Sequence, residues 1–195
     1  QWRIDLVGFM LGNMKNIFLC ILFNYSTIFC VNAQPLIQWQ KSMGGSGSDF
    51  TSSIRATTDG GFIIAGTSSS NDSDVTGNHG GRDYWIVKTD NIGNIQWQRS
   101  YGGSVDDFAN DVRQTSDGGF IIAGYSESND SDVTANYGHR DFWIVKTDSL
   151  GSISWEKNYG GSEFEIPYSV QETFDGGYVV AGYSNSIDGD LAGTF

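Results

Sequence analysis

The chain has 195 residues, with 26 glycines, two prolines and 14% aromatic residues. This composition is typical of β-structure joined by tight turns, and the length suffices for one domain with a core. The net charge of −12 argues against nucleic acid or an anionic membrane as the partner.

The N-terminal part of the chain has the pattern of an export signal. Residues 1–13 precede Met14, a good start residue, and we expect them to lie outside the natural coding sequence. Residues 14–33 are predicted to be a signal peptide, with a basic start, an apolar run and a Val-Asn-Ala cleavage site at 31–33. We therefore expect a mature chain that is secreted or held at the cell surface.

A membrane anchor is the alternative interpretation of this segment. Asn24 interrupts the apolar residues, and the run is shorter than the ~20 residues that span a bilayer. A lipoprotein site at Cys30 is disfavoured by the bulky Phe29 before it. We therefore predict no membrane insertion of the mature chain. Because Cys20 and Cys30 both lie in the signal, the mature chain must fold without disulfides.

An internal repeat of 58 residues dominates the rest of the chain. Residues 37–94 match residues 95–152 at 39 of 58 positions without a gap. The first unit has four strand patterns, at 53–58, 62–68, 83–89 and 94–100. A turn joins the first strand to the second, a polar loop joins the second to the third, and another turn joins the third to the fourth. The first strands of the later units are expected at 111–116 and 169–174.

The hydrophobic pattern of these strands indicates how the units are arranged. The second and third strands are apolar on both faces, as in strands buried on two sides, and the fourth alternates like an edge strand. We therefore predict an all-β chain, an incomplete β-propeller built from four-stranded antiparallel blades, with two full blades and part of a third. A linear β-solenoid is the alternative.

The repeat divides the mature chain into four parts. Residues 34–48 are expected to be a lone strand that closes a missing last blade, residues 49–106 and 107–164 two complete blades, and residues 165–195 a truncated third blade. Two blades cannot close a ring, so the outer units should expose apolar surface and strand edges. We therefore expect this chain alone to be poorly soluble or oligomeric. The remaining blades of its own full-length chain are expected partners.

The repeated runs DGGFIIAGYS, SNDSDVT, DFWIVKTDSLGSISW and YGGS resemble a repeat of large secreted proteins from bacteria that use a type IX secretion system. Such proteins usually end in a C-terminal sorting domain. The resemblance covers essentially all of residues 34–195 and implies secretion or surface display. A looser resemblance links residues 90–97 and 148–155 to the tryptophan-docking motif of quinoprotein-type propellers. We interpret Trp39, Trp97 and Trp155 as inter-blade packing, not as a cofactor site.

The loop between the second and third strands has the oxygen spacing of a calcium loop. An EF-hand places oxygen ligands at positions 1, 3, 5 and 12. The corresponding residues are Asp72, Asp74, Thr76 and Asp83 in the first unit, and Asp130, Asp132, Thr134 and Asp141 in the second. This pattern makes calcium a candidate cofactor. The alternative is a solvated loop in which the Asn and Asp side chains form local turns.

No catalytic constellation stands out in the sequence. His79 and His139 break the repeat, but neither has a recurring partner for nucleophilic or acid–base work, so we expect solvated loop residues. We predict a non-catalytic module with a binding or adhesion role, for a protein or glycan ligand. The alternative is the propeller part of a glycan-active enzyme or quinoprotein-type dehydrogenase whose site lies in the missing part.

Overall fold

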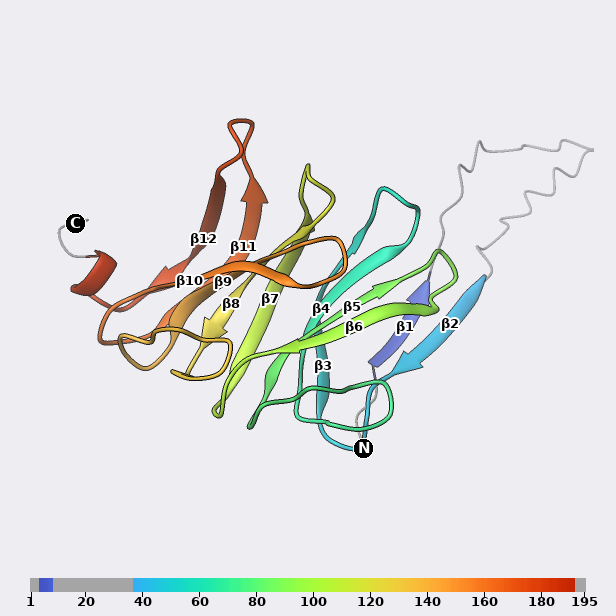
Figure 1. The fold of residues 1–195 in the computed structure, drawn as a ribbon, viewed down its shortest axis with the longest axis horizontal. Helices are drawn as coiled ribbons and strands as arrows, with labels where there is room; N and C mark the ends of the chain where they lie inside the picture. The colour runs from blue at the N-terminus through green and yellow to red at the C-terminus, as the bar shows by residue number, and fades with distance from the viewer. Residues whose placement is uncertain (1–3, 9–36, 192–195) are drawn as a thin grey trace, which may run out of the picture.

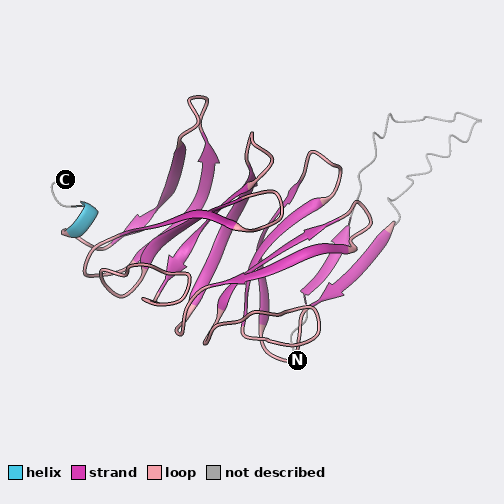
Figure 2. Cartoon of the chain, viewed as in Figure 1, coloured by secondary structure: helices cyan, strands magenta, loops and turns pink. Residues whose placement is uncertain are grey.

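The computed structural model describes residues 4–8 and 37–191, so the predicted signal peptide at 14–33 lies outside the described residues. This part of the chain is all-β apart from a short 3-10 helix at Gly189–Leu191 (Figure 2). Its twelve strands form two four-stranded and two two-stranded sheets, and all the pairs within them are antiparallel.

The sheets follow one another along the chain and lie side by side (Figure 1). The first four-stranded sheet contains β3 (Asp49–Ala56), β4 (Phe62–Ser68), β5 (Asp83–Thr89) and β6 (Ile95–Tyr101). The second contains β7 (Asp107–Gln114), β8 (Phe120–Ser126), β9 (Asp141–Thr147) and β10 (Ile153–Tyr159). The two-stranded sheets are β1 (Ile4–Gly8) with β2 (Trp39–Met43), and β11 (Glu165–Glu172) with β12 (Tyr178–Ser184). The predicted all-β, four-stranded antiparallel architecture is thereby confirmed, and it is compatible with propeller blades.

The first strand of each unit begins four residues earlier than the sequence pattern predicts. In β3, pairing with β4 starts at Asp49, opposite Ser68, and continues past a register shift between Thr51 and Ser53. A bulge of this kind lets one strand carry an extra residue without ending the ladder. The four residues that precede the predicted start, 49–52, therefore belong to the strand.

β2 was expected to be the lone closing strand of a missing blade, and in the structure it lies beside another strand. It pairs with β1, with Ile4 opposite Met43 and Gly8 opposite Trp39. Because Met43 is equivalent to Tyr101 in the repeat, β1 lies beside β2 as β5 lies beside β6. The physical reason is that an unpaired strand offers a row of free N–H and C=O groups to any extended segment that reaches it.

The core consists of layers between successive sheets. Residues from β4 and β5 pack against residues from β7, β8 and β9 in one cluster, which includes Ile63, Ile86, Val112, Phe120 and Trp143. The next residues along β4 and β5 face the other way, towards Met43 of β2. β4 and β5 are thus covered on both sides, as their apolar sequence predicts. The predicted inter-blade tryptophan packing is also present, since the ring of Trp97 lies 5.7 Å from that of Phe120.

Gly119 shows how closely the strands approach at the Asp-Gly-Gly turn. A Cβ atom at Gly119 would lie 2.2 Å from the carbonyl oxygen of Thr147, whereas at the equivalent Gly177 the nearest atom is at 3.1 Å. We predict that Gly119→Ala lowers the free energy of unfolding by about 1–3 kcal/mol through overpacking, and that Gly177→Ala has little effect. Urea denaturation of both variants measures this, and equal losses would contradict the difference in packing.

Candidate functional site

Two carboxylates of the long loop and one at the start of the first strand accept hydrogen bonds from the Gly-Gly-Ser turn that precedes each unit. Three successive amides, at residues 44, 45 and 46, donate to Asp74, Asp49 and Asp72 over 3.2, 2.8 and 2.7 Å. The same three bonds recur in the second copy with Asp132, Asp107 and Asp130, and in the third with Asp190, Glu165 and Asp188. The hydrogen bond from Ser46 lowers the pKa of Asp72. Because this arrangement is repeated, we interpret these hydrogen bonds as structural contacts that attach each long loop to the turn.

The structure brings Asp72 and Asp74 together at one turn but gives the other candidate calcium ligands different partners. Thr76 Oγ1 accepts from Gln98 Nε2 at 2.6 Å, and Asp83 accepts from His79. In the second copy, the Thr134 hydroxyl contacts Glu156, and Asp141 accepts from the Tyr137 amide. Among residues 4–8 and 37–191, no group of three or more His, Cys, Asp or Glu is placed to hold a metal ion. Calcium binding stays a prediction.

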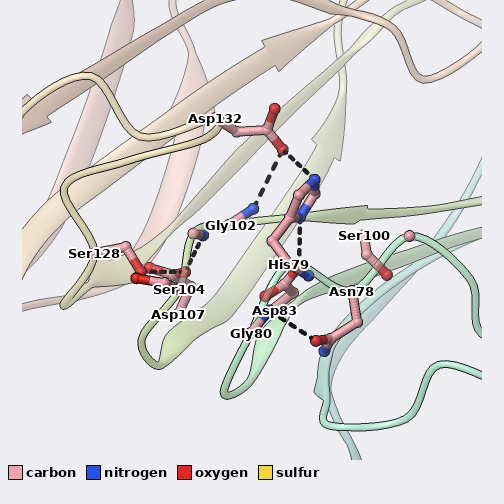
Figure 3. A network of polar contacts seen from close by, with 12 residues as sticks. Asn78, His79, Gly80, Asp83, Ser100, Gly102, Ser104, Asp107, Ser128 and Asp132 are labelled. Atoms are coloured by element: carbon pink, nitrogen blue, oxygen red, sulfur yellow. Dashed lines mark hydrogen bonds and ion pairs between the residues drawn. The ribbon is translucent and has the colours of Figure 1, made fainter.

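His79 lies between the loops of the first two copies, which differs from the solvated position expected for it. Its Nδ1 atom is 2.7 Å from Asp83 Oδ2, and its Nε2 atom is 3.8 Å from Asp132 Oδ2 (Figure 3). The backbone amide of His79 also donates to Asp83 Oδ2, at 2.9 Å. The imidazole is 32% exposed and has a carboxylate near each ring nitrogen. His139, by contrast, is exposed and stacks on Phe164.

Asp83 is a fully buried carboxyl that contacts the Nδ1 atom of the His79 imidazole. Burial raises the pKa of Asp83, and the hydrogen bonds from His79 oppose that shift. Its Oδ1 atom has no hydrogen-bond partner within the described residues. Burial likewise raises the pKa of the equivalent Asp141, to about 6. In the second copy Tyr137 replaces His79, so only the first copy has an imidazole at this carboxyl.

A cleft of about 470 Å³ opens beside His79. Its walls include Gln98, Arg99 and Tyr101 from β6, and Asp132 from the second copy's loop. The cleft therefore combines amide, guanidinium, imidazole, phenol and carboxylate groups, which supply both hydrogen-bond donors and acceptors. Lys157 and Glu156 replace Arg99 and Gln98 in the second copy, so the lining of this cleft is not repeated.

Asp111 forms a second non-repeated cluster, which the sequence analysis missed. Its buried carboxylate accepts from Ser53 Oγ at 2.8 Å, from Arg55 Nη2 at 2.9 Å and from Ser169 Oγ at 3.2 Å. Burial raises the pKa of Asp111, but the hydrogen bonds and the neighbouring guanidiniums of Arg55 and Arg113 outweigh it and lower the pKa overall. This side chain links the first strands of three successive sheets. The sequence contained one signal for this cluster, because Asp111 is charged whereas the equivalent residue in both other copies is serine.

The described residues define a protein of repeated, blade-like four-stranded sheets with a polar cleft between two repeats. No protein-family model matches the chain, and no curated protein matches it. The relation to secreted repeats of type IX secretion bacteria therefore stays an expectation. Of the helical residues described, none belongs to a helix long and apolar enough to cross a membrane.

Proposed function

We propose that this chain is a non-catalytic binding module of the β-propeller type, and that the cleft beside His79 receives its ligand. The observation that carries the proposal is the position of His79. It breaks the repeat, and it lies in a cleft between two repeats with a carboxylate near each ring nitrogen. Residues shared by all copies serve the fold, so residues that differ are the ones free to serve recognition.

The chemistry of the cleft favours a glycan over a protein segment as the ligand. Hydroxyl groups of a sugar both donate and accept hydrogen bonds, and the lining of Asp132, Arg99 and Gln98 offers both kinds of partner. A protein ligand would need a larger contact surface than this cleft offers.

The proposal includes export and assembly. The leader pattern at residues 14–33 supports secretion or surface display. The repeat supports further blades in the same polypeptide, which would close the ring around the two four-stranded sheets. An adhesion role at the cell surface suits such a module, because neighbouring blades can present several loops at one face.

The repeat provides a matched pair of variants to test ligand binding. His79→Tyr gives the first copy the residue of the second, and Tyr137→His makes the reverse exchange. We predict that His79→Tyr weakens glycan binding at least about tenfold, since one good hydrogen bond to a charged or polar group is worth about 1.4 kcal/mol or more, and that Tyr137→His leaves it unchanged. A glycan array followed by calorimetry measures this. Equal affinities for His79→Tyr and the original chain would overturn the assignment of the cleft.

Hydrolysis is a second candidate function, favoured by one specific observation. A buried carboxylate, Asp83, contacts Nδ1 of His79 while Nε2 is directed towards Asp132 in the cleft. A carboxylate that orients an imidazole in this way is a common setting for a general base. If the chain hydrolyses 4-nitrophenyl acetate or a 4-nitrophenyl glycoside, His79→Tyr should abolish the reaction. A rate equal to that of buffer in the original chain rejects this candidate.

A further inference from the structure

The cluster around Asp111 contains more positive than negative charge. Arg55 pairs with Asp111 through Nη2 at 2.9 Å, and Arg113 pairs with it through Nε at 3.4 Å. In the described part of the chain, neither arginine has an ion pair with any other carboxylate. Burial raises the pKa of Asp111, but its hydrogen bonds and the two guanidiniums lower the pKa overall, so the carboxyl is ionised at neutral pH. Two guanidiniums therefore share one carboxylate, although the chain as a whole has a net charge of −12.

The terminal nitrogen atoms of Arg113 are accessible to a ligand. A guanidinium has five N–H donors in a planar fork. The Nε atom of Arg113 donates to Asp111 Oδ2, whereas within residues 4–8 and 37–191 its two Nη atoms have no protein acceptor. The side chain is 34% exposed. The edge of the guanidinium that carries the Nη atoms therefore faces no protein partner, and this edge can bind two oxygens of a carboxylate, sulfate or phosphate group at once.

The protein satisfies the Arg55 guanidinium only in part. Its Nη1 atom donates to the carbonyl oxygen of Ile54, and its Nη2 atom donates to Asp111. Its Nε atom is buried and has no hydrogen-bond partner among the residues that the structure describes. Such an unpaired donor is costly, and in a native structure it indicates a group with a further role. The side chain as a whole is 39% exposed, so its positive charge can act on a ligand outside the sheet.

Asp111 is itself held firmly, so it can fix the position of both arginines. Ser53 Oγ of β3 donates to its Oδ1 atom at 2.8 Å. From β11, Ser169 Oγ and the Val170 amide donate to its Oδ2 atom at 3.2 and 3.3 Å. The carboxylate is 2% exposed and is anchored by neighbouring strands on both sides of β7. Charged groups that stand on strands and are held by such hydrogen bonds are preorganised for binding.

We propose that Arg113 and Arg55 form a binding site for an oxyanion, namely the carboxylate, sulfate or phosphate group of a small ligand, and that Asp111 positions both guanidiniums. Arg113 supplies the pair of Nη donors, and Arg55 supplies the second positive charge. The site lies on the first strands β3 and β7, whereas the walls of the cleft beside His79 include residues of β6. This inference is therefore independent of the ligand proposed for the cleft.

The test measures binding of sodium sulfate, phosphate, acetate and glucuronate to the full chain, with sodium chloride used to keep the ionic strength constant. The NMR signals of the arginine Nε–H groups should shift saturably at Arg113, and calorimetry gives the affinity. Arg113→Gln introduces the residue found at the equivalent position 171 of the third copy. It should weaken binding at least about tenfold, because it removes charged hydrogen bonds. Arg113→Lys should also weaken binding, since lysine keeps the charge but not the planar fork.

Arg82→Gln is the matched control, because Arg82 is also a partly exposed arginine that pairs with one aspartate, Asp106. It should leave anion binding unchanged. Equal affinities for Arg113→Gln and the original chain would overturn the proposal, as would an equal loss in Arg82→Gln, which would show that only the general charge matters. Equal affinities for Arg113→Lys and the original chain would overturn it too.

The four anions distinguish the sources of the bound group. Tighter binding of glucuronate than of acetate supports the site and identifies an acidic sugar as the ligand. Tightest binding of sulfate or phosphate supports the site for a free inorganic anion or for an ester of it. No saturable binding of any of the four anions would reject the site. Circular dichroism checks that each variant keeps its sheets.

Discussion

Replacing Trp143 by alanine should lower the free energy of unfolding by about 3–5 kcal/mol, the usual cost of truncating a buried aromatic residue. Trp143 is fully buried between the two four-stranded sheets. Its ring centroid lies 4.6 Å from that of Tyr84, and its Nε1 atom donates to Glu156 at 2.7 Å. The variant would therefore leave a large cavity and remove a donor from Glu156.

Trp155→Ala is the matched control for this prediction. Trp155 is also a strand tryptophan, but it is 37% exposed and packs mainly on Tyr178, with ring centroids 5.7 Å apart. We expect a loss of about 1–2 kcal/mol, because less apolar area is removed from burial. Urea denaturation followed by tryptophan fluorescence and circular dichroism measures both values. Similar losses in the two variants would show that the sheets do not pack on Trp143 as the structure indicates.

The stability of the chain should fall as the pH rises from about 4 to about 7, because of Asp107. Burial raises the pKa of Asp107 to about 6 from 3.8, and the nearby carboxylate of Asp83 adds to the shift. Between these two pKa values the folded chain binds more protons than the unfolded chain, so ionisation favours unfolding. A shift of about two units corresponds to a stability difference on the order of 3 kcal/mol.

Two substitutions separate the loss of stability with rising pH at Asp107 from the gain of stability with rising pH at Asp59. Asp107→Asn should remove about half of the decline between pH 4 and 7, because Asp141, whose pKa burial also raises to about 6, contributes a similar share. Asp59 has a lowered pKa, chiefly through its hydrogen bond from Lys88, so its stabilisation is fully present above about pH 4 and is lost progressively as the pH falls towards its lowered folded-state pKa. Asp59→Asn should therefore be less stable than the original chain at pH 7, and the difference should begin to shrink only as the pH falls below about 4. Thermal unfolding across this pH range tests both, and a parallel decline in Asp107→Asn and the original chain would contradict the role of Asp107.

The sequence by itself determined the all-β class, the 58-residue period and most strand positions. These features are local or repeated. Asp-Gly-Gly turns supply a residue with positive φ, as Gly118 does at 83°, and the apolar runs of β4 and β5 require cover on both faces. Interpreting Trp97 as inter-sheet packing succeeded for the same reason, because a residue at every equivalent position has a structural role in each copy.

Only the tertiary structure decided where the polar side chains find partners. In the structure Asp72 binds a turn amide and Asp83 binds His79, and the spacing along the loop did not reveal these partners. Asp111 meets Ser53 and Ser169 only because three sheets bring their first strands together. Hydrogen bonds act over about 3 Å between groups far apart in sequence. A sequence pattern shows which groups need partners, and the packing of the sheets determines which ones they meet.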